Sequence, residues 1–158
     1  MDISFALEGR KFNYRACAVI ISKNRILAMH DERSPYFYLP GGRVRMGETA
    51  EQAVVREIRE ELGVAPKIGR PLWLNQAFFT EDVDGTRYHE LCIYFLMDIS
   101  DTDLSERGDS FTLTEGEHTH AFEWLAFDRL KDEYFYPLFL KEQIFDLPKV
   151  FTIRTECE

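Results

Sequence analysis

The sequence of 158 residues predicts a single α/β domain, residues 1–158, built as a sandwich in which helices cover a mixed β-sheet. Segments typical of strands stand before and after one long amphipathic helix, and further helical patterns come late in the chain. No internal repeat, low-complexity stretch or Pro/Ser-rich linker divides the sequence. A chain of this length with 45% hydrophobic residues can bury one sizeable core.

The segments before the helix are typical of strands. Residues 14–21 and 25–29 are rich in apolar side chains and flank a turn-like stretch at 22–24, so they predict a hairpin. Residues 36–39 form a short extended stretch that ends at Pro40. The chain is therefore expected to contribute at least three strand segments before the helix begins.

The long helix has recognisable signals at both ends. Thr49 with Gln52 three residues later is a capping-box pattern, so the helix is expected to begin at about Ala50. Gly63, followed shortly by Pro66, supplies the stop. These local signals predict the helix independently of its surroundings.

The segments after the helix continue the strand pattern. Residues 71–80 and 87–98 predict a second hairpin around residues 82–85. The polar stretch 100–116 is expected to be a loop. The remaining expected elements are a strand, two short helices and an edge strand, at residues 122–126, 126–131, 137–146 and 150–154.

Composition limits the partners of this protein. The net charge of −9, from 19 basic and 28 acidic residues, argues against a general nucleic-acid or anionic-membrane surface. Three widely spaced cysteines, Cys17, Cys92 and Cys157, predict neither a disulfide framework nor a metal knuckle. The sequence has no signal-peptide pattern and no apolar run near the ~20 residues that span a bilayer, so we expect a cytoplasmic protein without a membrane partner.

Acidic residues crowd one face of the predicted helix. Apolar residues recur at every fourth position from Val54 to Leu62 and form its buried stripe, while Glu57, Glu60 and Glu61 fall on another sector. Like charges three or four residues apart repel by ~0.2–0.5 kcal/mol per pair. A divalent cation between the carboxylates would remove this repulsion, and oxygen ligands favour Mg²⁺ or Mn²⁺. A solvated charged face is the alternative.

A glycine pair just before the helix extends this pattern. Gly41 and Gly42 are expected to form a turn that a ligand can approach closely. From Gly42 onward the sequence matches the Nudix box, Gly-x5-Glu-x7-Arg-Glu-U-x-Glu-Glu-x-Gly-U with U a bulky aliphatic, at every specified position. The chain therefore resembles a Nudix hydrolase, and the resemblance implies a Nudix-type α/β/α sandwich. The matching residues are Gly42, Glu48, Arg56, Glu57, Ile58, Glu60, Glu61, Gly63 and Val64.

The resemblance implies an enzyme that hydrolyses the pyrophosphate bond of a nucleoside diphosphate linked to another moiety. The products would be a nucleoside monophosphate and a phosphorylated compound. Arg56 would brace Glu57, and Glu48 would act behind the ligands or with an additional ion; an ordinary acid near a helix N-terminus is the alternative for Glu48. The implied Mg²⁺ or Mn²⁺ ligands are Glu57, Glu60, Glu61 and the backbone carbonyl of Gly41.

The general base is expected outside the box, in a loop at residues 114–120. Many members of the family place an acid several residues before a tryptophan, here Trp124, and Glu117 is the best positional match. Glu115 is the reserve, and both could simply be solvent-exposed loop acids. His118 and His120 lack a third ligand at zinc spacing, so zinc is not favoured.

Four further residues are candidates for substrate binding. Arg43 and Arg45 flank the glycine pair and could contact phosphates, although ordinary surface charge would explain them equally well. Tyr36 belongs to an aromatic stretch that could stack on a base or pack in the core. His89 could line the cleft or lie at a strand edge.

Subset signatures leave the substrate undecided. The ADP-ribose type carries a proline fifteen residues after the box, where this chain has Phe79, and the diadenosine polyphosphate type a tyrosine where it has Glu81. The NADH and coenzyme A signatures are not matched, so a nucleoside triphosphate or nucleotide sugar stays open. The expected partner is a small nucleotide, and a homodimer is left open. A non-catalytic nucleotide-sensing module is the alternative, although such modules usually have a damaged box.

Overall fold

The computed structural model describes residues 1–157 of the chain. Within this range the backbone forms ten strands, two α-helices and two short 3₁₀ helices. In chain order the elements are β1 (Ser4–Leu7), β2 (Arg10–Val19), β3 (Ile21–Ser22), β4 (Arg25–Asp31), β5 (Gly41–Arg43), α1 (Ala50–Leu62), β6 (Lys67–Thr80), β7 (Arg87–Asp98), η1 (Leu104–Glu106), β8 (Ser110–Glu115), β9 (His118–Ala126), η2 (Phe127–Asp132), α2 (Leu140–Gln143) and β10 (Thr152–Cys157).

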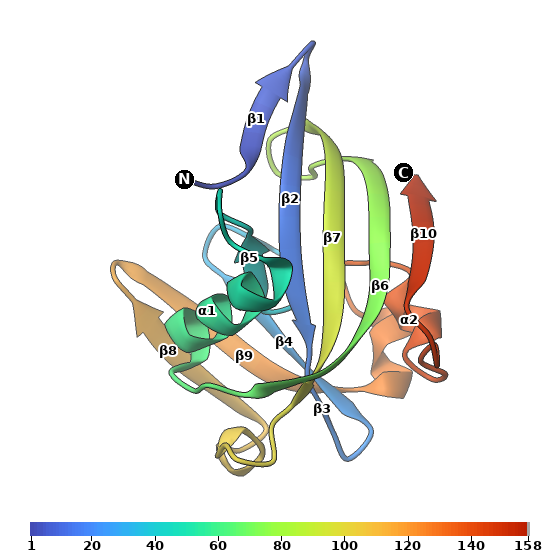
Figure 1. Ribbon diagram of the computed structural model, residues 1–158. Coiled ribbons are helices and arrows are strands. Elements are labelled where there is room, and N and C mark those ends of the chain that lie inside the picture. Colours follow the sequence, from blue (N-terminus) through green and yellow to red (C-terminus); the bar gives the residue numbers. More distant parts are fainter. Residues whose placement is uncertain (158) are drawn as a thin grey trace.

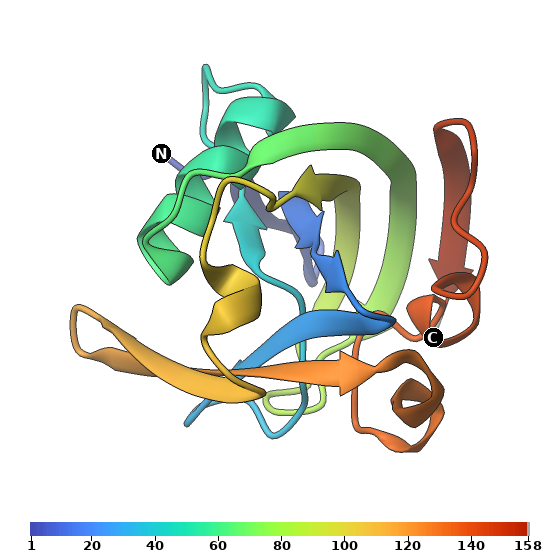
Figure 2. The same ribbon diagram turned by 90° about the horizontal axis from the view of Figure 1, so that it is seen from below.

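The strands form two sheets with helices on opposite sides, which confirms the predicted α/β class. The six-stranded sheet has the order β1-β2-β7-β6-β10, with β5 paired to β2, and the four-stranded sheet has the order β3-β4-β9-β8. The pairs β2–β7 and β6–β10 are parallel and the others are antiparallel, so the larger sheet is mixed. Figures 1 and 2 show α1 and α2 on opposite sides of these sheets.

Helix α1 begins and ends where the sequence predicts. The hydroxyl of Thr49 accepts a hydrogen bond from the Gln52 N–H at 3.1 Å, and the Gln52 side chain accepts one from the Thr49 N–H at 2.9 Å. Gly63 ends the helix with φ 70°, a left-handed conformation that glycine adopts without strain. Ile58 and Leu62 are fully or almost fully buried, so the helix is held against the sheets by its apolar stripe.

Two apolar cores lie on the two sides of the sheets. One packs α1 against inward residues of β2, β4 and β9, including Ala16, Leu27 and Phe122. The other lies beneath η2 and α2 and includes Trp73 and Phe139, whose rings meet edge to face at 5.1 Å between centroids. Side chains from both sheets enter each core, so burial fixes the sheets relative to one another.

The predicted hairpins are confirmed in one case and only partly in the other. Strands β6 and β7 pair antiparallel around residues 82–85 as expected. The first turn also exists, with Lys23 and Asn24 at φ 54° and 59°, the conformation of a two-residue hairpin turn. However, that hairpin joins only β3 and β4, because the chain passes from β2 into the second sheet at the buried residue Ile20.

The prediction of a loop over residues 100–116 is wrong. This stretch contains η1 and then β8, which pairs antiparallel with β9. Phe111 and Leu113 alternate with exposed Thr112 and Thr114 and pack partly against the α1 core. The strand was missed because its two apolar residues are surrounded by polar ones.

The late elements follow the prediction with shifted boundaries. Helices η2 and α2 lie at the two positions expected to be helical, and α2 is only four residues long. The edge strand β10 starts at Thr152 and continues to Cys157, beyond the expected end at Arg154. It pairs parallel with β6 at the border of the larger sheet. No helix in the described part of the chain is long and apolar enough to cross a membrane.

Candidate active site

The glycine pair lies in a strand rather than in the expected turn. Gly41 and Gly42 form β5 together with Arg43, and they pair with Cys17 and Ala16 of β2. A Cβ atom on Gly42 would lie 2.4 Å from Cδ and Oε1 of Glu57, and one on Gly41 would lie 2.4 Å from the Ala16 carbonyl oxygen. The absence of side chains here therefore makes room for the Glu57 carboxylate and for the neighbouring backbone.

Arg56 connects the acidic residues of the box. Its Nε and Nη2 atoms donate to Glu48 at 2.7 and 3.0 Å, and its Nη1 donates to Glu57 Oε1 at 2.9 Å. Nη2 also donates to the Arg43 carbonyl at 3.0 Å. The hydrogen bonds from Arg56 lower the pKa of Glu48 to about 2, so this carboxylate is ionised at neutral pH. The contact between Arg56 and Glu57 is the one that the sequence predicted.

Glu57 and Glu61 are carboxylates held away from water. The Glu61 residue is 7% exposed, and its Oε1 accepts a hydrogen bond from the Gly41 N–H at 2.9 Å. Burial, followed by the charge of Glu57, raises the pKa of Glu61 well above its usual value. Burial also raises the pKa of Glu57, against the opposing effect of Arg56. Two neighbouring acids with raised pKa values are destabilised as carboxylates until positive charge is supplied.

The donor set fits a hard divalent cation in part. Carboxylate oxygens are the ligands that Mg²⁺ and Mn²⁺ prefer, and Glu57 and Glu61 both lie against β5. Glu60 lies further out, with its side chain 39% exposed and its Oε2 3.5 Å from Arg56 Nη1. Among residues 1–157, no three His, Cys, Asp or Glu side chains converge as a metal cluster. Glu57 and Glu61 are therefore the predicted ligands that this conformation brings together with Gly41.

The two candidates for the general base occupy different parts of a hairpin. The predicted loop at 114–120 is instead the end of β8, a turn at Gly116 and Glu117, and the start of β9. Glu117 is exposed in this turn. Glu115 is half-buried, its Oε1 lies 3.4 Å from Nε2 of the buried His120, and its charge contributes to the raised pKa of Glu61. The structure thus brings Glu115, and not Glu117, toward the box.

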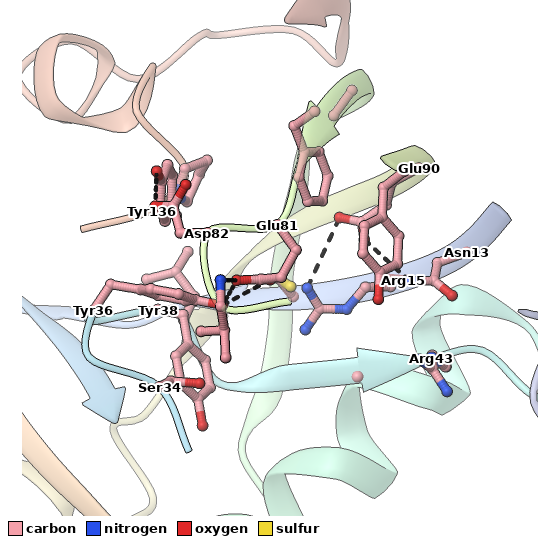
Figure 3. Close-up of a pocket in the computed structure, with 18 of the residues that line it drawn as sticks. Asn13, Arg15, Ser34, Tyr36, Tyr38, Arg43, Glu81, Asp82, Glu90 and Tyr136 are labelled. Carbon is pink, nitrogen blue, oxygen red and sulfur yellow. Dashed lines mark hydrogen bonds and ion pairs between the residues drawn. The ribbon is translucent and has the colours of Figure 1, made fainter. Parts of the chain in front are cut away.

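A cavity of about 660 Å³ adjoins the box. In Figure 3, Asn13 and Arg15 enter it from β2, Glu90 from β7, and Tyr36 and Tyr38 from the segment before β5. Arg15 lies opposite Arg43 in the β2–β5 pairing, so two cations stand side by side at the wall nearest the box. Such a wall can bind phosphate oxygens.

Two of the four predicted substrate-binding residues line this cavity. Arg43 and Tyr36 line it, whereas Arg45 lies outside, within 3.8 Å of Asp2 and 4.0 Å of Glu60. His89 also lies outside and packs between Phe12 and Phe78, with ring centroids at 5.6 and 4.5 Å. His89 was misplaced because successive residues of a strand face opposite sides of the sheet, and its neighbours Tyr88 and Glu90 face the cavity.

The loop between β6 and β7 lines the cavity and is attached to two other segments of the chain. Asp82 accepts hydrogen bonds from the hydroxyls of Tyr134 and Tyr136, the latter at 2.7 Å, and Glu81 accepts one from the Tyr36 hydroxyl at 2.9 Å. These contacts hold the loop against two distant segments. Most of the lining of this cavity was not predicted, although polar and apolar residues alternate along β2 in the sequence. The additional lining residues include Asn13, Arg15, Tyr38, Asn75, Glu81, Asp82, Glu90, Tyr136 and Glu156.

The fold and the box together define a Nudix-type domain with an intact set of box residues. The family model described as NUDIX domain matches residues 11–143 of the chain. An ADP-ribose pyrophosphatase of Methanocaldococcus jannaschii is 37% identical over 116 residues, which cover 72% of this chain and 66% of that protein. The chain therefore belongs to the Nudix family.

Solved structures agree with this assignment. A MutT NUDIX hydrolase from Burkholderia pseudomallei is 26% identical, with a TM-score of 0.51 over 74% of this chain and 84% of that one. A MutT protein from Bacillus halodurans shares the fold with a TM-score of 0.60 at 14% identity, over 90% and 89% of the two chains. The chain spans about two thirds of the length of the Methanocaldococcus protein.

Proposed function

We propose that this protein hydrolyses the pyrophosphate bond of a nucleoside diphosphate linked to another moiety, releasing a nucleoside monophosphate and a phosphorylated product. The observation that carries the proposal is the pair of carboxylates of half-buried Glu57 and buried Glu61, with raised pKa values beside a cavity that has a cationic wall. Family membership supports the same chemistry, because Nudix hydrolases act on pyrophosphates and generally need divalent metal ions. We take residues 1–158 as one functional domain.

The proposed ligands of Mg²⁺ or Mn²⁺ are Glu57, Glu60, Glu61 and the Gly41 carbonyl. A bound divalent ion supplies charge neutralisation on the diphosphate and a lowered pKa for bound water. Arg56 keeps the Glu57 carboxylate in position through its 2.9 Å hydrogen bond. For Glu60 to join the other ligands, its side chain must leave its contact with Arg56.

The remaining roles follow from charge and position. Arg15 and Arg43 at the cavity wall would bind the phosphate oxygens and orient the diphosphate toward the box. Glu115 is our proposed general base, because its charge is felt by Glu61 while Glu117 is exposed in a turn. His120, 3.4 Å from Glu115, would keep that carboxylate near the box.

The experiment is a product analysis with a defined panel. Purified protein is incubated with Mg²⁺ and ADP-ribose, nucleoside triphosphates, nucleotide sugars or dinucleoside polyphosphates, and the products are separated by chromatography. ADP-ribose belongs in the panel because one relative carries that name, although Phe79 stands where the ADP-ribose type has proline. Release of a nucleoside monophosphate that stops with a chelator supports the proposal.

Matched variants separate chemistry from fold. Glu61→Gln keeps the shape of a proposed ligand and removes its charge, so we expect a loss of several orders of magnitude in kcat, as for other groups that act directly on the transition state. Glu51→Gln is the control, because Glu51 is exposed in the first turn of the same helix. Wild-type turnover in a folded Glu61→Gln protein would refute the proposed site. Nucleotide binding without turnover of any compound would instead favour a sensing module.

A further inference from the structure

A row of residues, all polar except Ala77, crosses five strands at the floor of the cavity. Glu156 of β10 lies opposite Ala77 of β6, and Ala77 lies opposite Glu90 of β7. Glu90 lies opposite Asn13 of β2, which in turn lies opposite Ser4 of β1. Residues opposite one another in a sheet share a face, and the first four of these line the cavity. We name Glu156, Ala77, Glu90 and Asn13 the floor row.

Ala77 leaves a gap between two carboxylates. Neighbouring strands lie about 4.8 Å apart, so the backbones of Glu156 and Glu90 stand roughly 9–10 Å from each other on either side of Ala77. Between them only a methyl group rises from the sheet. A planar ring can approach this gap and place its polar edge near both acids.

Both acids are held in place by donors of the protein. Glu156 Oε2 accepts from the Phe139 N–H at 3.2 Å, and its Oε1 accepts from Asn75 Nδ2 at 3.4 Å. Glu90 Oε2 accepts from Asn13 Nδ2 at 3.5 Å, and its Oε1 lies 3.8 Å from Arg15. A carboxylate can accept about four hydrogen bonds, so each keeps free acceptor capacity.

Asn75 adds another acceptor beside the floor row. Because its Nδ2 is directed to Glu156, its Oδ1 points away, and this oxygen is buried without a hydrogen-bond partner among residues 1–157. The residue is 1% exposed and lines the cavity. A buried acceptor left unpaired is unfavourable, so a donor that reached it would be favoured.

The row begins beside the cationic wall, where Glu90 lies 3.8 Å from Arg15, and ends beyond the family match at Glu156. Arg15 and Arg43 stand near the box, whereas Glu156 lies at the far edge of the sheet. The family model ends at residue 143, so β10 and Glu156 are contributed by a part of the chain that it does not include. A nucleotide with its phosphates at the arginines would direct its base toward the acids.

We propose that the floor row is the base-recognition site of this protein and that it selects bases presenting amino groups. The inference rests on the proposed function, because it assumes a nucleotide in the cavity. Cytosine, adenine and guanine each offer an exocyclic amino group to the carboxylates of Glu156 and Glu90. Uracil and thymine offer one ring N–H flanked by two carbonyl oxygens, which the same carboxylates repel. The floor row thus determines which nucleosides are bound.

The test is binding of nucleoside monophosphates measured by calorimetry. CMP and UMP form a matched pair, since they differ only along one edge of the ring: cytosine has an amino group beside a bare ring nitrogen, and uracil has a carbonyl oxygen beside a ring N–H. We expect the wild-type protein to bind CMP at least ~10-fold more tightly than UMP, the effect of one mispaired buried polar group. Equal affinities for the two, or no binding of any monophosphate at millimolar concentration, would overturn the inference.

Variants of the row sharpen this result. Glu156→Gln places an amide NH₂ in the row, which can donate to a carbonyl, so the preference for CMP should collapse or reverse. Ala77→Val fills the gap and should lower the affinities for CMP and UMP by a similar factor. Thr155→Val is the control, because Thr155 is exposed on the opposite face of β10. An unchanged CMP-to-UMP ratio in a folded Glu156→Gln protein contradicts the proposal.

Binding and turnover answer separate questions. Selective binding of CMP without hydrolysis of any nucleotide would refute the proposed hydrolase function and support the floor row. Metal-dependent hydrolysis with equal affinity for CMP and UMP would support the function and refute the floor row.

Discussion

Replacing Gly42 with alanine tests whether the position of the Glu57 carboxylate governs activity. The added Cβ would lie 2.4 Å from Cδ and Oε1 of Glu57, while ordinary van der Waals contact begins at about 3.4 Å. The carboxylate must therefore move by about 1 Å, the difference between these distances. That movement disturbs the 2.9 Å hydrogen bond from Arg56.

The expected result is a large loss of activity with a small loss of stability. A misplacement of about 1 Å at a reacting centre can lower the rate by ~10²-fold, and we expect a fall of that size in kcat. The fold should tolerate the change because the colliding atoms are the far end of a flexible side chain. Alanine is also favoured over glycine within a strand by ~0.5–1 kcal/mol, which offsets part of the lost ion pair.

The assay is steady-state hydrolysis of the fastest nucleotide at saturating Mg²⁺, with thermal unfolding measured in parallel. Gly9→Ala is the control, because nothing lies within 4 Å of a Cβ there but its φ of 76° strains any other residue. The control should lose thermal stability and keep its kcat, which is the reverse of the pattern expected for Gly42→Ala. If Gly42→Ala retains a kcat within twofold of wild type, the placement of Glu57 against β5 does not matter and the reasoning fails.

Three further predictions concern the β8–β9 hairpin, Glu48 between β5 and α1, and the N-terminal cap of α1. Glu115→Gln should lower kcat by ~10²–10⁴-fold, and Glu117→Gln should keep a kcat near wild type. If steady-state kinetics instead show the larger loss for Glu117→Gln, Glu117 in the turn is the general base. Because hydrogen bonds from Arg56 lower the pKa of Glu48 from 4.5 to about 2, Glu48→Gln should reduce stability at neutral pH. The difference from wild type should disappear in urea titrations as the pH falls from 4.5 to about 2, and a constant difference would contradict the argument. Thr49→Ala should lower the free energy of unfolding by ~1 kcal/mol without changing kcat, and calorimetry beside kinetics checks both.

Helix α1 could be predicted from the sequence because its determinants are local. The cap at Thr49, the stop at Gly63 and the four-residue apolar repeat lie within one segment, and each appears as expected. The contact between Arg56 and Glu57 belongs to the same category, since adjacent side chains of opposite charge readily meet.

Features that depend on pairing between distant strands could not be predicted in this way. Gly41 and Gly42 are typical of a turn in isolation, and only their pairing with β2 makes them a strand. The face of the sheet on which the His89 side chain lies follows from the register of β7, which the sequence does not reveal. Glu156 was overlooked because the expected edge strand ended at Arg154, two residues too early to include it.

The alternation along β2 separates two properties of this protein that natural variation can change independently. Asn13, Arg15 and Cys17 line the cavity, whereas Ala16 and Ala18 on the opposite face pack in the core beneath α1. A substitution on the first face can alter which compounds bind in the cavity, while the packing beneath α1 stays unchanged. Insertion of a single residue would exchange the two faces and damage both at once. New specificities in this lineage should therefore arise by point substitution in β2 and hardly ever by a change in its length.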